Sequence, residues 1–377
     1  MIKQIKPKTN FSLFLVLLIP NVLFAMDIDR FLVSLEKKDL INSFLGLIVE
    51  KDRPDFNFKI QEVRPVELPW SNSMSQAKIL FQDGGCEIAG NNESILTFGD
   101  SFLGAWKGKD IPEYFPKGIC NSILIATKSG NGQFLTDSKQ IGKQFIPLEG
   151  EETWERHRIW PGGGGFINNR YYVFFERVVL SENAWGFSNE NFVGLMRSEK
   201  NSWKTWERVA ISSRFPFKSP PFSVVSGKDG WLYCYFIDLT SPFSFVRTAR
   251  VKPEEIENPK AYFVLPKAAA DGIYGQVSVV WNEYLQCFVM AHIGSAIGDP
   301  KRIYFRYSRK AEGPFSPPQK VFEDREKFSH SDWSGMLYCP FLHPIYFSGD
   351  GKRMLLTYCR VKEKFGIPHA IEVTVDR

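Results

Sequence analysis

The chain lacks the signatures of several common enzyme classes. It has no Gly-x-Ser-x-Gly, no His-Glu-x-x-His and no dinucleotide-binding fingerprint. A serine-hydrolase elbow, a zinc-protease helix and a nucleotide-cofactor fold are therefore not expected. A Cys-x-x-Cys pair is also absent, which argues against a zinc or redox motif. Intrinsic disorder is excluded, because 44% of the 377 residues are hydrophobic and 24% are charged.

Long apolar runs are missing except at the N-terminus. There, Lys3, Lys6 and Lys8 precede the mostly apolar stretch Phe11–Phe24, which ends at the small residue Ala25. This is the pattern of a secretory signal peptide over residues 1–25. An uncleaved membrane anchor is the alternative, but the apolar run is shorter than the ~20 residues that span a bilayer. The sequence thus predicts a secreted or periplasmic protein with no membrane association after cleavage.

The chain has little net charge once this segment is removed. The net charge of +5 includes the three lysines of residues 1–25, a segment without acidic residues, so the mature chain carries about +2. Polybasic runs do not occur. Nucleic acid is therefore not expected as a partner, and the sequence indicates no oligomeric state.

Cysteines are few, six in all. An even number in an exported chain permits disulfides, and the alternative is a set of small buried hydrophobic side chains. Their spacings are long and irregular. Cys339 and Cys359 lie on two consecutive predicted strands and are the favoured pair.

Aromatic residues, in contrast, are abundant, with 10 Trp, 13 Tyr and 33 Phe making up 15% of the chain. Aromatics favour strands and form large, flat contact surfaces. Residues 27–50 instead show near-helical spacing of apolar side chains, followed by a proline-marked connector. No later stretch predicts an amphipathic helix. The sequence predicts an N-terminal helical element and connector at 26–74, then one all-β domain at 75–377.

Short strands separated by turn residues fill that second region, in five groups that recur at roughly 50–70 residues. This is the period of a four-stranded propeller blade. We therefore predict a five-bladed β-propeller, with a β-sandwich carrying insertions as the competing fold. The expected strands are 94–100, 121–127, 170–176, 191–197, 231–237, 276–281, 287–292, 303–308, 338–347, 354–360 and 370–375.

A set of short motifs follows the same order. The chain reads Phe-Gln-Asp-Gly-Gly-Cys-Glu at 81–87 and Leu-Thr-Phe-Gly-Asp-Ser-Phe at 96–102. Asn-Ser at 121–122, Trp-Pro-Gly-Gly at 160–163, Gly-Pro-Phe-Ser at 313–316 and the segment 338–358 continue the series. Together these resemble the domain of unknown function 4185 family, over roughly residues 75–377. The chain departs from the family at 82–85, where Gln-Asp-Gly-Gly replaces a Thr-Asp-Leu-Gly-like element.

The resemblance implies a five-bladed propeller, akin in architecture to arabinanases and fructosidases. Some members resemble endo-acting glycoside hydrolases on D-arabinan. A polysaccharide or oligosaccharide partner would follow, and neither a cofactor nor a metal is implied.

Glycoside hydrolysis needs two carboxyl groups on opposite sides of the scissile bond. Asp83 and Asp100 are the best candidates, because both flank strands of the first blade beside glycines that allow close approach of a ligand. The alternative for Asp100 is a turn residue that accepts backbone N–H groups. Glu176 ends an apolar strand, so it either meets solvent, pairs with a nearby arginine or faces the cavity as a third catalytic candidate. Glu87 is a weaker one.

Five further residues are candidates for binding substrate. Trp160 could stack on a sugar ring or pack between blades, and His343 could hold a sugar hydroxyl or be an internally satisfied core histidine. The others, which lie in or before expected inner strands, are Asn121, His157 and Arg158. Gly162 to Gly165 has no Lys-Ser/Thr after it, so a tight crossing between blades is expected instead of a phosphate loop.

The predicted function is hydrolysis of a furanosidic, arabinan-like linkage by a carboxyl pair that includes Asp83 and Asp100. The alternative is a non-catalytic propeller that binds a glycan or a protein with the same aromatic cavity. The two differ in whether a pair of carboxyl groups meets near the propeller axis.

Overall fold

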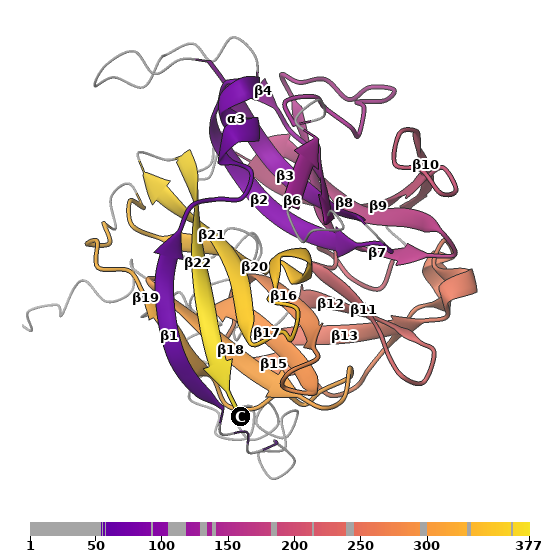
Figure 1. The fold of residues 1–377 in the computed structure, drawn as a ribbon. Helices are drawn as coiled ribbons and strands as arrows, with labels where there is room; N and C mark the ends of the chain where they lie inside the picture. Colours follow the sequence, from indigo (N-terminus) through magenta and orange to yellow (C-terminus); the bar gives the residue numbers. More distant parts are fainter. Residues whose placement is uncertain are drawn as a thin grey trace, which may run out of the picture.

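Five sheets follow one another around the molecule in chain order (Figure 1). The structure is a computed structural model that describes residues 54, 56, 58–91, 93–104, 118–128, 134–137, 141–181, 187–212, 215–238, 245–294, 300–329, 333–362 and 365–377. This arrangement is a five-bladed β-propeller, so the predicted fold is confirmed. The expected signal peptide and the helical pattern of 27–50 lie outside the described residues.

In each of the first two blades, neighbouring strands pair antiparallel. Their order along the chain leads from the innermost strand to the outermost one. The first consists of β2 (Ile79–Ala89), β3 (Glu93–Leu103), β5 (Ser122–Lys128) and β6 (Phe134–Asp137), with the short β4 (Gly118–Ile119) beside β3. The second consists of β7 (His157–Ile167), β8 (Arg170–Leu180), β9 (Phe187–Ser198) and β10 (Trp206–Ser212).

The third and fourth blades repeat the pattern. The third contains β11 (Ser223–Ser226), β12 (Leu232–Asp238), β13 (Phe245–Val251) and β14 (Phe263–Val264), with β15 (Ala270–Asp271) also on β13. The fourth contains β16 (Tyr274–Asn282), β17 (Cys287–Ile293), β18 (Arg302–Ser308) and β19 (Gln319–Glu323). Short 3₁₀ turns occur at η2 (Pro253–Glu255), η3 (Pro259–Ala261) and η4 (Pro344–Tyr346).

The last blade closes the ring with a strand from the other end of the chain. Its order is β20 (Leu337–Leu342), β21 (Arg353–Lys362), β22 (Phe365–Asp376) and then β1 (Lys59–Val66). β1 comes from the expected connector and pairs antiparallel with β22 (Figure 1). Arg64 of β1 reaches Glu372 of β22 at 2.7 Å. Pairing of the two chain ends covers an edge that would otherwise be open.

The helix of the described residues is α3 (Ser71–Ala77), which connects β1 to the first blade. It begins after the fully buried Trp70 and ends at Lys78, whose φ of 57° is left-handed. Within the described residues, no helix has the length and apolar character that crossing a membrane requires.

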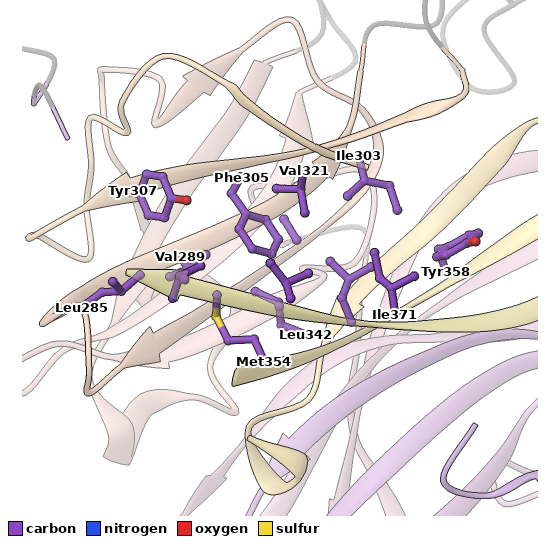
Figure 2. Close-up of a cluster of buried hydrophobic side chains, with 14 of the residues drawn as sticks. Leu285, Val289, Ile303, Phe305, Tyr307, Val321, Leu342, Met354, Tyr358 and Ile371 are labelled. Carbon is purple, nitrogen blue, oxygen red and sulfur yellow. The ribbon is translucent and has the colours of Figure 1, made fainter. Parts of the chain in front are cut away.

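Apolar side chains fill the spaces between neighbouring blades. Figure 2 shows one such cluster, where the fourth blade supplies residues such as Phe305 and Val289 and the last blade supplies Leu342, Met354 and Ile371. Aromatic side chains also pack between the second and third blades, where Phe174 meets Phe217 edge-on at 5.8 Å. Much of the large aromatic content of the sequence is therefore packed blade against blade.

The four consecutive glycines lie inside β7, an inner strand, and not at a crossing between blades. A Cβ atom on Gly163 would lie 2.4 Å from the carbonyl oxygen of Phe222, and one on Gly162 would lie 2.8 Å from Pro220. The glycines are thus needed for space, because the backbone of the third blade approaches β7 closely.

Candidate active site

Asp83 projects from an irregular part of the innermost strand of the first blade. The pairing of β2 with β3 shifts register between Gln82 and Gly84 and again before Cys86. Gly84 has a φ of 93°, a conformation that side chains rarely adopt. Such bulges re-aim side chains away from the regular alternation of a strand. The two glycines that follow Asp83 therefore set the direction in which its carboxyl projects from β2.

Asp100 stands opposite, near the end of β3, directly after a glycine. A Cβ atom on Gly99 would lie 3.5 Å from the Cβ of Asp83 and 3.9 Å from the ring of Trp160. These are ordinary contact distances, so the residue before Asp100 packs directly beside Asp83 and Trp160. The structure thus brings the two predicted aspartates together.

The surroundings of the two carboxyls shift both of their pKa values upward. Burial and, to a smaller extent, the charge of Asp83 raise the pKa of Asp100 to about 7, against the opposing effects of Trp160 and Arg158. Burial likewise raises the pKa of Asp83 to about 6, against a hydrogen bond from Tyr338. Both carboxyls therefore titrate closer to neutral pH than a free aspartate does.

The second blade supplies the partners of Asp100. Trp160 donates its indole N–H to Asp100 Oδ1 at 3.0 Å, and Arg158 Nε lies 3.9 Å from the same oxygen. Arg158 is itself held in place, since its guanidinium stacks 3.5 Å above the ring of Trp154 and donates to the carbonyl groups of Trp154 and His157. Two of the three predicted side chains of β7, Trp160 and Arg158, therefore lie against Asp100.

The last blade supplies the partner of Asp83, which the sequence did not reveal. Tyr338 of β20 donates its hydroxyl to Asp83 Oδ1. Tyr338 belongs to a motif already noted, but only as part of an apolar inner strand. The sequence feature that could have identified it is a tyrosine near the start of β20. Three blades thus contribute to one site, with the two carboxyls on the first blade between its two neighbours.

Glu176 lies on the strand next to this group. It is the direct cross-strand partner of Trp160 in the β7–β8 pair and is only 9% exposed. Residues opposite each other on antiparallel strands project to the same face. Glu176 therefore shares the face of the sheet that carries Trp160, and its catalytic role stays a prediction.

Asn121 and His157 make extensive contacts within the protein. Asn121 is fully buried, donates to the carbonyls of Ile146 and Ile159, and accepts from the backbone N–H groups of Phe145 and Ile146. His157 is 5% exposed, and its Nδ1 accepts from the backbone N–H of Thr153. These contacts order the loop before β7, and substrate binding by either residue stays a prediction.

His343 is fully buried where the last blade meets the first. Its Nε2 lies 2.7 Å from Thr357 Oγ1, its Nδ1 lies 3.5 Å from Glu87 Oε2, and its ring stands edge-on to Trp70 at 5.4 Å. Glu87 also accepts from the Ser94 hydroxyl at 2.7 Å. The histidine therefore contacts a buried carboxyl on the same strand as Asp83, and its binding role stays a prediction.

All six cysteines are buried and free of disulfides in the structure, and three of them, Cys86, Cys339 and Cys359, pack in one cluster. In the described part of the chain, no group of three or more histidine, cysteine and acidic side chains could hold a metal ion.

Comparison with known proteins was made at the levels of family, sequence and fold. The model of a family described as Domain of unknown function (DUF4185) matches residues 72–363. No curated protein matches the sequence significantly. The fold is shared with a crystal structure from Bacteroides ovatus ATCC 8483, provisionally named a hydrolase, with a TM-score of 0.57, 12% identity, and coverage of 86% of this chain and 97% of that one.

Two glycoside hydrolases show weaker structural similarity. One is the GH43_1 enzyme from Xanthomonas citri in complex with xylotriose, at a TM-score of 0.49 and 13% identity over 79% of this chain and 91% of that one. The other is a family 117 glycoside hydrolase from Zobellia galactanivorans, at a TM-score of 0.44 and 11% identity over 84% and 90% of the two chains.

Proposed function

Since the chain belongs to the DUF4185 family, we propose that it is an exported glycoside hydrolase in which Asp83 and Asp100 form the catalytic carboxyl pair. The observation that carries the proposal is the proximity of these two partly buried carboxyls, each with a donor from a different neighbouring blade. Fold similarity at 12% identity supports only the architecture.

The reaction requires one protonated carboxyl group to act on the leaving oxygen and one ionised carboxylate to activate water or attack the sugar. A pair with pKa values of about 6 and about 7 holds one proton near neutral pH. Both forms are then present at once, which is the condition that two-carboxyl chemistry needs. A binding protein would have no need of this shared proton.

The resemblance to D-arabinan-degrading enzymes suggests a furanosidic, arabinan-like substrate. Trp160 lies beside the pair and would present an aromatic ring to a sugar while its N–H stays on Asp100. Residues 1–25 would direct the chain out of the cytoplasm. The export step is tested by the N-terminal mass of the protein recovered from the producing cells, with cleavage after residue 25 as the expected result.

A panel of polysaccharides rich in furanose or pyranose linkages tests the activity. We expect the purified protein to release new reducing ends from a furanosidic member of the panel. The variants Asp83→Asn and Asp100→Asn should each lose about 10²–10⁴-fold in rate, as is common when an acid or base is removed. If the protein releases no sugar from any substrate yet retains binding to a glycan, the hydrolase proposal is wrong and the binding-module reading replaces it.

A further inference from the structure

Gly366 lies directly against the hydrogen bond between Tyr338 and Asp83. Tyr338 is the second residue of β20, the inner strand of the last blade, and its hydroxyl donates to Asp83 Oδ1 on β2. Gly366 is the second residue of β22, two strands further out, and pairs with Val361. A Cβ atom on Gly366 would lie 1.7 Å from the Tyr338 hydroxyl and 2.2 Å from Asp83 Oδ1. The glycine therefore leaves the space that this one hydrogen bond occupies.

The backbone around Tyr338 is also irregular. The pairing of β20 with β21 shifts register between Tyr338 and Phe341. Cys339, in between, has a φ of 53°, which is unusual for a residue with a side chain. Bulges of this kind turn a side chain out of the regular alternation. Both partners of the hydrogen bond, Asp83 and Tyr338, thus project from bulges on neighbouring inner strands.

We propose that Tyr338 is a positioning residue for the reaction, holding Oδ1 of Asp83 so that Oδ2 is the oxygen that faces substrate and carries the exchanged proton. The expected effect of Tyr338 on catalysis rests on the hydrolase function proposed above. A phenol that donates to Oδ1 occupies one side of the carboxyl, so a proton on Asp83 resides on Oδ2. The same donation favours the ionised carboxylate.

Among the groups that act on the Asp83 carboxyl, Tyr338 is the side chain that hydrogen-bonds to it. Asp100 on β3 adds a like charge, and Arg158 on β7 lies against Asp100. Cys339 on β20 and Cys359 on β21 stand near Tyr338, where burial keeps the pKa of the Cys339 thiol above its usual range and the thiol neutral. The phenol is thus the neighbour whose removal should change Asp83 most.

The test measures the titration of Asp83 in the full chain directly, by the carbon-13 signal of its carboxyl group, assigned with Asp83→Asn. In Tyr338→Phe we expect the midpoint to move up by about one to two units, because a hydrogen bond to a charged group is lost. Site-specific replacement of Tyr338 by 3-fluorotyrosine, a more acidic donor, should move it down. The matched control is Tyr284→Phe, which removes a similar tyrosine-to-aspartate bond of 2.7 Å to Asp376 on β22 and should leave Asp83 unchanged.

Two further readouts separate positioning from general support of the fold. Gly366→Ala, which displaces both bonded atoms, should shift the Asp83 midpoint in the same direction as Tyr338→Phe. In kinetics, Tyr338→Phe should lower kcat and move the limb of the pH profile that belongs to Asp83, with little change in KM. If the Asp83 midpoint is the same in the wild type, Tyr338→Phe and the fluorotyrosine protein, the inference is wrong and the hydrolase proposal still stands. If the midpoint moves as expected but no substrate is hydrolysed, the contact is supported and the hydrolase proposal fails.

Discussion

Replacing Asp100 by asparagine should make the protein more stable at pH 8 than the wild type. The pKa of Asp100 rises from 3.8 to about 7, mainly through burial. A carboxyl whose pKa is higher in the folded than in the unfolded chain stabilises the fold when protonated. Its contribution is complete below about pH 4 and is lost as the pH rises through about 7. Asparagine cannot ionise, so the variant avoids this loss.

The size of the effect follows from the shift. About three units at about 1.4 kcal/mol per unit gives about 4 kcal/mol as an upper figure. The Asp100 side chain is 17% exposed and loses its attraction to Arg158 in the variant, so we expect about 2–4 kcal/mol at pH 8. The Trp160 hydrogen bond can persist, because the asparagine side chain keeps one acceptor oxygen.

Urea unfolding at pH 4 and at pH 8 measures this prediction. The two proteins should be nearly equal at pH 4, and the variant should be the more stable at pH 8. The control is Asp350→Asn, an exposed turn residue whose pKa is lowered, chiefly by the Ser348 hydroxyl. That variant should instead lose stability at pH 8. An Asp100→Asn protein that is equally or less stable than the wild type at pH 8 would refute the reasoning.

Three other predictions concern the scaffold. Gly163→Ala should lower the free energy of unfolding by about 1–3 kcal/mol in urea, since its Cβ would meet the Phe222 carbonyl at 2.4 Å, whereas Gly349→Ala, with open space around it, should change little. Asn121→Ala should cost about 2–4 kcal/mol, because several buried backbone groups lose their partner. Deleting β1 should lower Tm and promote aggregation by exposing the edge of β22, as calorimetry and light scattering would show.

The middle strands of the blades were predictable because they are rich in aromatic and β-branched residues. The expected strand 170–176 falls within β8, and 287–292 falls within β17. The inner strands β2, β7 and β11 were missed. Glycines fill β7 because it packs closely against the third blade, and β11 has only four residues. Close approach at the centre of the propeller therefore removes the residue types by which strands are recognised.

The site was predictable where its residues are close in sequence. Asp83 and Asp100 stand beside glycines in two adjacent strands, so their meeting follows from one hairpin. Tyr338 lies 255 residues from Asp83 and reaches it only because the ring of blades closes. The strand β1 shows the same limit, since its partner β22 lies at the opposite end of the chain. Contacts made by ring closure leave no local pattern in the sequence.

The central claim is that Asp83 and Asp100 act as one acid–base pair, and the pH dependence of kcat/KM for sugar release tests it most directly. With pKa values of about 6 and about 7, the rate should pass through a narrow maximum between these values, falling on the acid side as the base is protonated and on the alkaline side as the acid ionises. Asp83→Asn and Asp100→Asn should each abolish most of the rate. A rate that is flat from pH 5 to pH 8, or that survives either substitution, would contradict the account.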